Sequence, residues 1–131
     1  MTVDDASVLA LADVLIAAWP AMEPGTHQLD FDDGSVKLTL IFGDAVAILP
    51  TLQLRVDAFY LDGFAPAKNP ELWTPAIFNS LAALAVDDAT FSTYTSAGDV
   101  KRALLQAGFE YRKVAGFGWK RAMLVGRFAP R

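Results

Sequence analysis

The 131-residue chain has no cysteine and only one histidine, His27. It therefore cannot form a disulfide, use a thiolate as a nucleophile, or build a zinc site from its own side chains. It also lacks an apolar run near the roughly 20 residues that a membrane helix needs, and its acidic start does not resemble a secretory leader. We therefore expect a cytoplasmic protein with no membrane contact and no metal site.

Basic residues are scarce over the first 100 positions, where fourteen acidic residues accompany three basic ones. Residues 101–131 reverse this balance with eight basic residues and one acid, although the whole chain has a net charge of −4. A basic segment is a candidate contact for a polyanion. The alternative is that these side chains only solvate the surface of the last helix and strands.

Hydrophobic residues make up 53% of the chain, enough for a sizeable core and for a single domain over residues 1–131. Hydrophobic periodicity and turn residues predict an amphipathic helix that ends before Pro20. They then predict a hairpin of strands over 27–31 and 36–42, a short helix over 45–52 and a buried apolar strand over 56–61.

The second half continues this alternation, with a helix from Pro75 to about Leu84, a strand over 89–94 and a helix that ends at Gly108. Closing strands follow over 109–114 and 121–128. Alternating strands and helices predict an α/β fold, with a sheet that is mostly parallel and ends in a C-terminal antiparallel hairpin.

Two aspartates, Asp44 and Asp62, each follow the end of a predicted strand. Ligands of α/β sheets bind beyond the carboxyl ends of strands, which favours these two acids over the others. Asp44 can accept a hydrogen bond from an exocyclic amine of a cofactor, while Gly43 lets the backbone approach a ring. An equally good interpretation makes Asp44 the N-cap of the next helix.

Asp62 ends an apolar strand and precedes a loop with three prolines between residues 65 and 75. A carboxylate at the rim of an apolar pocket can act as a base or hold an amine. The alternative is a simple Asp-Gly turn, but the rigid loop favours a binding site. Its candidate substrate contacts are Phe64, Pro66, Lys68, Asn69 and Trp73.

The connection between the last two predicted strands contains Phe117, Lys120 and Arg121. An aromatic ring beside two cations can stack on a base and pair with a phosphate, a combination typical of single-stranded RNA sites. A plain turn is the alternative. These three residues are therefore further candidates for substrate binding.

The segment Leu61-Asp-Gly-Phe-Ala-Pro-Ala-Lys-Asn-Pro70, within residues 56–75, strongly resembles the methyltransferase domain of the MnmC family, the bifunctional enzymes of 5-methylaminomethyl-2-thiouridine biosynthesis in tRNA. The likeness extends upstream through Phe42-Gly43-Asp44 and downstream through Gly116-Phe-Gly-Trp-Lys-Arg-Ala-Met123, so it covers nearly the whole chain. It implies a Rossmann-like domain that transfers a methyl group from S-adenosyl-L-methionine to the aminomethyl nitrogen of a tRNA wobble uridine.

The resemblance also implies roles for individual residues. Gly43 and Asp44 would lie beside the adenine of S-adenosyl-L-methionine, and Asp62 would be the catalytic carboxylate in an amine pocket that extends to Trp73. Methyl transfer to an amine needs a neutral lone pair, so a carboxylate that accepts the amine proton fits the reaction. The partner would be tRNA, and FAD would belong only to a separate oxidoreductase domain.

Two departures from the family pattern affect these expectations. The family's glycine-rich cofactor loop and ribose-binding acid precede the region that matches this chain, and Ala122 stands where the family usually has Glu. We therefore expect residues 1–131 to be the C-terminal portion of the methyltransferase domain, inactive alone, with the strand over 36–42 lacking a sheet neighbour. The alternative is a non-catalytic Rossmann-like module that binds RNA or acts as a scaffold.

Overall fold

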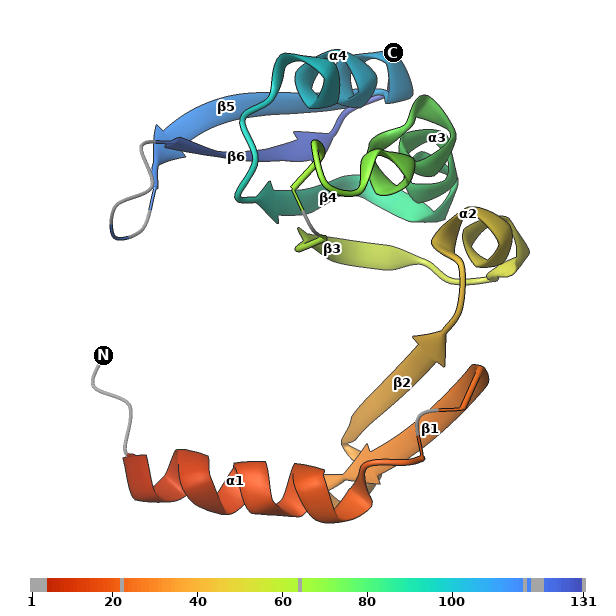
Figure 1. Cartoon of the computed structure of the whole chain (residues 1–131), viewed down its shortest axis with the longest axis vertical. Helices are drawn as coiled ribbons and strands as arrows, with labels where there is room; N and C mark the ends of the chain where they lie inside the picture. The colour runs from red at the N-terminus through yellow and green to blue at the C-terminus, as the bar shows by residue number, and fades with distance from the viewer. Residues whose placement is uncertain (1–4, 22, 64, 117, 119–121, 131) are drawn as a thin grey trace. The chain divides into compact units, whose positions relative to one another are not determined.

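The computed structural model describes residues 5–21, 23–63, 65–116, 118 and 122–130. The chain divides into two compact units, Met1–Gly43 and Asp44–Arg131, which are described separately (Figure 1). The expectation of a single domain over residues 1–131 stays a prediction. None of the helices in the described part of the chain is both long and apolar enough to span a membrane.

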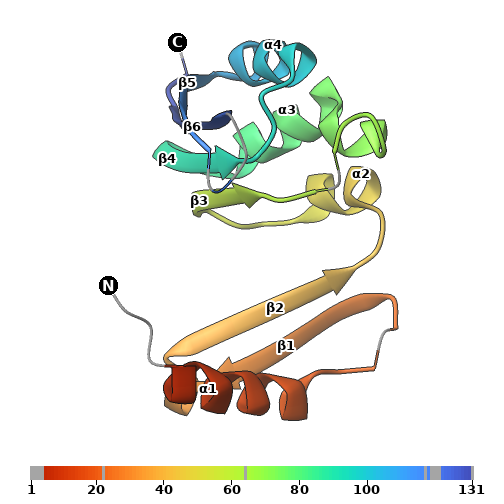
Figure 2. The same cartoon turned by 60° about the vertical axis from the view of Figure 1, so that its left-hand side comes forward.

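The first unit consists of helix α1 (Asp5–Ala18) and a hairpin of strands β1 (Gly25–Phe31) and β2 (Val36–Phe42). The strands run antiparallel, as Figure 2 shows. Their register runs from Gly25 opposite Phe42 to Phe31 opposite Val36. The turn contains Asp32 and Asp33 with φ of 53° and 55°, a region that Asp tolerates better than most residues.

The predicted hairpin is confirmed, and among the described residues its second strand has no neighbour other than β1 and belongs to no larger sheet. β2 pairs with β1 over its whole length. The short turn brings the two strands together locally, and each of them pairs along one edge only in this two-stranded sheet.

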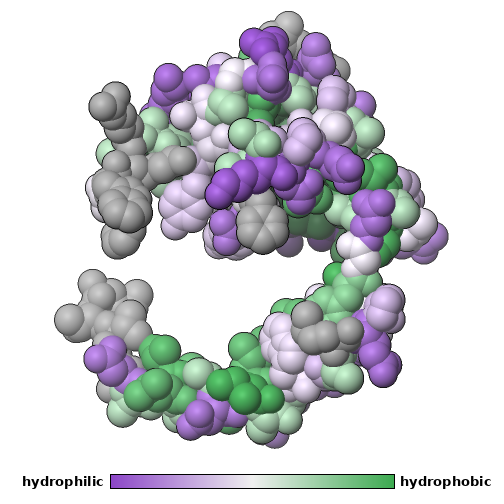
Figure 3. Space-filling model, viewed as in Figure 1, coloured by the Kyte–Doolittle hydropathy of each residue, from purple (hydrophilic) through white to green (hydrophobic). Residues whose placement is uncertain are grey.

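Helix α1 was predicted to be amphipathic. The helix forms, but it has no buried residue, and Leu11 and Ile16 are each 70% exposed. Figure 3 shows hydrophobic surface, coloured green, along this helix. The helix therefore presents apolar surface.

The second unit is built on a four-stranded sheet of order β3-β4-β6-β5. Its strands are β3 (Val56–Leu61), β4 (Ala85–Thr93), β5 (Phe109–Ala115) and β6 (Ala122–Phe128). The pairing of β3 with β4 is parallel, whereas β4 with β6 and β6 with β5 pair antiparallel. The α/β class and the closing antiparallel hairpin are confirmed. The share of parallel pairing is smaller than expected because β6 returns between β4 and β5.

The helices of this unit are α2 (Ala45–Ile48), α3 (Pro75–Leu84) and α4 (Gly98–Ala107), with short 3-10 turns at Leu49–Thr51 and Pro70–Trp73. Pro75 opens α3, as predicted, because its missing N–H is not needed in the first turn. Gly108 ends α4 with φ of 101°, the left-handed conformation that favours glycine.

One face of the sheet carries the core. Phe59, Phe91, Phe109 and Leu124 are buried there together with Phe78 of α3 and Leu104 of α4. The Phe91 and Phe109 rings meet edge to face, with centroids 5.6 Å apart. Alternate residues point to the other face, where Tyr60 is 83% exposed. The expectation of a fully buried β3 is therefore wrong, because β3 is an edge strand of this sheet and Phe59 is its one buried residue among those described.

Candidate functional site

The candidate site lies where β3 and β4 end side by side. Their parallel register places Leu61 opposite Thr93, so Asp62 follows one strand where Tyr94 follows the other. The Thr95 backbone N–H donates to Thr93 Oγ1 at 3.4 Å, and the Ala97 N–H donates to Thr95 Oγ1 at 3.2 Å. These bonds hold the chain between β4 and α4 beside Asp62.

Asp62 borders two hollows. The smaller one, about 150 Å³, is lined by loop residues that include Pro66 and Trp73, and by residues 93–95. The larger one, about 330 Å³, is lined by Tyr60, Tyr94 and Met123 among others. Asp62 is exposed, so the carboxylate is available to a ligand from either hollow. Asp62, which the sequence analysis selected, therefore lies beside two hollows at the ends of β3 and β4.

Sequence reasoning missed Tyr60 and Tyr94, whose side chains are 83% and 52% exposed. Tyr60 directly precedes the last residue of β3, and Tyr94 directly follows the last residue of β4, so both lie at the same sheet edge as Asp62. Applying the strand-end rule to aromatic residues as well as acids would have found them. They supply two π faces next to a carboxylate.

The proline-rich loop is held against the core by Trp73, which is 9% exposed and contacts the Phe78 ring at a centroid distance of 6.4 Å. A Cβ atom at Gly63 would lie 3.1 Å from a methyl carbon of Leu72, so the loop packs closely over the residue after Asp62. Pro66 and Trp73 thus line the smaller hollow together with Asp62. Their contact with a substrate stays a prediction. Lys68 and Asn69 line neither of the two hollows, and their backbone N–H groups instead bond to the carbonyl of Ala65.

Asp44 is the N-cap of α2. Its Oδ1 accepts a hydrogen bond of 2.9 Å from the backbone N–H of Val46. The structure therefore shows the capping role, one of the two interpretations of this residue. A contact of Gly43 and Asp44 with a cofactor stays a prediction.

Four predicted substrate contacts, Phe64, Phe117, Lys120 and Arg121, lie outside the described residues. Among the residues that are described, no cluster of His, Asp and Glu side chains has the arrangement of a metal site.

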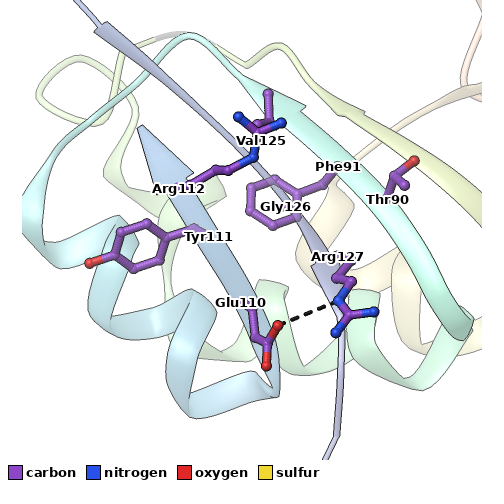
Figure 4. Close-up of a pocket in the computed structure, with 8 residues that line it drawn as sticks. All are labelled: Thr90, Phe91, Glu110, Tyr111, Arg112, Val125, Gly126 and Arg127. Carbon is purple, nitrogen blue, oxygen red and sulfur yellow. Dashed lines mark hydrogen bonds and ion pairs between the residues drawn. The ribbon is translucent and has the colours of Figure 1, made fainter. Parts of the chain in front are cut away.

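The basic residues of the C-terminal segment fall into paired and unpaired groups. Arg127 donates to Asp88 at 2.9 Å and to Glu110 at 3.4 Å, and the latter bond borders a hollow of about 420 Å³ (Figure 4). Arg102 pairs with Asp99 one turn away on α4. Exposed pairs of this kind contribute little stability, but they neutralise both arginines.

Lys101 and Lys113 differ from these arginines. The pKa of Lys101 lies below its ordinary value, chiefly because a hydrogen bond from Lys113 favours the neutral amine form of Lys101. Partial burial and the positive charge of Lys113 act in the same direction. Neither lysine forms an ion pair with any described carboxylate. Two like charges therefore lie together on this side of the unit.

Comparison with known proteins identifies the family of this chain. A sequence profile described as S-adenosyl-L-methionine-dependent methyltransferase matches residues 7–129. The chain belongs to this family. The resemblance found in the sequence is thus confirmed, and the cofactor that gives this methyltransferase family its name is S-adenosyl-L-methionine.

Individual methyltransferases of high similarity include proteins called tRNA 5-methylaminomethyl-2-thiouridine biosynthesis bifunctional protein MnmC. The one from Paraburkholderia phymatum is 72% identical over 99% of this chain, and the one from Paraburkholderia phytofirmans is 68% identical over the same share. The chain spans about one fifth of the length of these relatives, 20% in each case.

A solved structure shares the fold. The crystal structure of MNMC2 from Aquifex aeolicus aligns with a TM-score of 0.74 and 24% sequence identity, over 93% of this chain and 38% of that protein. The α/β architecture of this chain is therefore that of a known fold.

Proposed function

We propose that this chain forms the amine-binding part of a methyltransferase that methylates the aminomethyl group of a tRNA wobble uridine. The observation that carries the proposal is the position of Asp62, between two hollows at the carboxyl ends of β3 and β4. The names of the 72% and 68% identical relatives support tRNA as the substrate.

Asp62 is assigned the role of the catalytic base. An alkyl amine is largely protonated near neutral pH, and its nitrogen has no free lone pair in that form. The Asp62 carboxylate accepts a proton from this nitrogen and then holds the amine by a hydrogen bond. Pro66 and Trp73 form the wall that limits how the amine can turn, which keeps its lone pair directed at the methyl donor.

The described residues also fit the charged end of S-adenosyl-L-methionine, which supplies an electrophilic methyl group on a sulfonium. A sulfonium is a cation, and the larger hollow offers the Asp62 carboxylate with the rings of Tyr60 and Tyr94. Carboxylates and aromatic faces both attract cations. Gly43 and Asp44 are proposed to contact the adenine end of the same cofactor.

The chain is proposed to be the C-terminal portion of the methyltransferase domain and to work with the remaining portion of that domain. The 20% share of the relatives that it spans, and the word bifunctional in their names, support further domains. An FAD-dependent oxidoreductase domain is one of them in this proposal, and a cytoplasmic location follows from the tRNA substrate.

The decisive experiment replaces Asp62 by Asn in a full-length enzyme that carries these 131 residues. Methyl transfer from labelled S-adenosyl-L-methionine to tRNA with an unmethylated aminomethyl group is measured. We expect kcat to fall by roughly 100-fold or more, the usual scale for loss of a general base, with unchanged tRNA affinity.

Asp57→Asn is the matched control, because Asp57 is an exposed acid on the same strand. It should leave both quantities unchanged. An equal loss of tRNA affinity and kcat in Asp62→Asn would instead identify Asp62 as a turn residue. If the full-length protein binds tRNA but shows no methyl transfer, the result would favour the second candidate, an RNA-binding or scaffolding module. The basic C-terminal segment supports this second candidate.

A further inference from the structure

We propose that Lys101 and Lys113 together bind a backbone phosphate of the RNA substrate, close to the nucleotide that is methylated. This inference rests on the proposed function, since it takes RNA as the substrate. It adds a substrate-positioning site from α4 and β5 to the amine pocket beside Asp62.

The sheet register brings Lys113 to the same edge as Asp62. β4 and β5 both pair antiparallel with β6, so they run in the same direction as each other. One cross-strand row runs from Leu61 to Thr93, Leu124 and Lys113. Neighbouring strands are about 4.8 Å apart, so Lys113 lies about 14 Å from Leu61 along this row.

The helix packing brings Lys101 to Lys113. Val100 and Leu104 of α4 are fully buried against the sheet, and Lys101 is only partly exposed beside them. Lys113 belongs to the same face of β5 as the buried Phe109, the face that α4 covers. Figure 1 shows α4 lying along β5. The consecutive elements α4 and β5 thus bring the two lysine side chains into contact.

The arrangement lacks a counterion from the described residues. Asp99 is paired with Arg102, and Glu110 points to the opposite face of β5, where it meets Arg127. The lowered pKa of Lys101 reflects the contact between the two lysine side chains, in which the charge of Lys113 opposes a second charge on Lys101. An anion between them would remove this repulsion and accept hydrogen bonds from both.

Phosphate is the anion that fits the rest of the segment. Residues 101–131 carry eight basic residues and one acid, which is the charge pattern of a polyanion contact. A lysine acts on phosphate as a compact point charge with several donors, so two lysines from different elements can fix one phosphate without a preformed loop. Phosphate contacts position an RNA without reading its sequence.

The test measures binding of unmodified tRNA to the 131-residue chain by fluorescence anisotropy over a range of salt concentrations. The variant Lys101→Gln with Lys113→Gln should weaken binding by roughly 10-fold and reduce the slope of log K against log salt by about 1 to 2. The double variant relieves a like-charge contact, so it should fold at least as well as the parent chain.

The matched control, Lys37→Gln with Arg55→Gln, removes the same net charge from exposed positions elsewhere. It should change the slope much less. Equal slopes for the two double variants would overturn the proposal, and so would an absence of salt-dependent tRNA binding by the parent chain. Neither result bears on the kcat of Asp62→Asn, so the two proposals fail separately.

Lysine NMR distinguishes the source of the phosphate. Addition of tRNA should raise the pKa of Lys101 toward its ordinary value in the parent chain. Inorganic phosphate at the same total phosphate concentration should have a much smaller effect, because it lacks the other contacts of the polyanion. A response to inorganic phosphate with none to tRNA would overturn the assignment to RNA.

Discussion

Asp44 accepts a hydrogen bond of 2.9 Å from the backbone N–H of Val46, which makes it the N-cap of α2. The same residue was the leading candidate for a cofactor contact. A cap and a ligand contact can be separated experimentally, because the cap needs a side-chain oxygen whereas an amine ligand gains most from a negative charge.

Replacement of Asp44 by Ala should lower the free energy of unfolding by about 1 kcal/mol, as measured in urea, because one N–H at the start of α2 loses its acceptor. Asp44→Asn keeps a capping oxygen, so its free energy of unfolding should stay within a few tenths of a kcal/mol of that of the parent chain. If the cofactor role is correct, Asn should still weaken S-adenosyl-L-methionine binding in the full-length enzyme. Unchanged cofactor affinity in Asn would leave Asp44 with the structural role alone.

Gly126 is expected to tolerate no side chain. A Cβ atom there would overlap the carbonyl oxygen of Glu110 on the neighbouring strand and would lie 2.7 Å from a ring carbon of Phe91. Because backbone and a packed ring cannot easily move, Gly126→Ala should cost about 3 kcal/mol or more in thermal or urea unfolding.

Gly98→Ala is the control for this change. A Cβ at Gly98 would meet only the end of the flexible Arg102 side chain, at 3.4 Å, and the residue lies in the first turn of α4. It should stabilise the chain slightly or have no effect. A similar loss for both variants would contradict the packing described here.

The contact between Lys101 and Lys113 predicts a pH dependence of stability. The folded-state pKa of Lys101 lies below its unfolded value, so at alkaline pH between the two values the unfolded chain holds more protons. The free energy of unfolding contributed by this group should therefore rise as pH increases through that range. Lys113→Gln should raise the pKa of Lys101 in an NMR titration and remove this part of the pH dependence. An unchanged pKa would show that the two side chains do not interact.

The apolar surface of α1 is expected to cause self-association. Leu11 and Ile16 are each 70% exposed on a helix without a buried residue. Sedimentation velocity should show a concentration-dependent increase in size, and Leu11→Lys with Ile16→Lys should reduce it. Ala10→Lys with Ala17→Lys adds the same charge at exposed positions and removes no large apolar side chain, so it should have a smaller effect. A monomer at all concentrations would refute this expectation.

Local patterns were sufficient for most elements of the fold. The turn before Val36, the proline that opens α3 and the glycine that ends α4 act through their own backbone preferences. Such preferences depend on a few neighbouring residues, so they can be inferred without knowledge of distant contacts. The position of Asp62 after a strand follows from the same kind of local signal.

Contacts between elements determined the strand order and the neighbours of the charged residues, which the local patterns had not specified. The return of β6 between β4 and β5 determined the mixed sheet and the alignment of Lys113 with the edge that carries Asp62. The contact of Lys113 with Lys101 likewise depends on how α4 packs on β5. The sequence by itself determined which segments become strands and helices and which residues end them, because those choices are local. The order of strands and the neighbours of each charge depend on long-range pairing, and only the tertiary structure decided them.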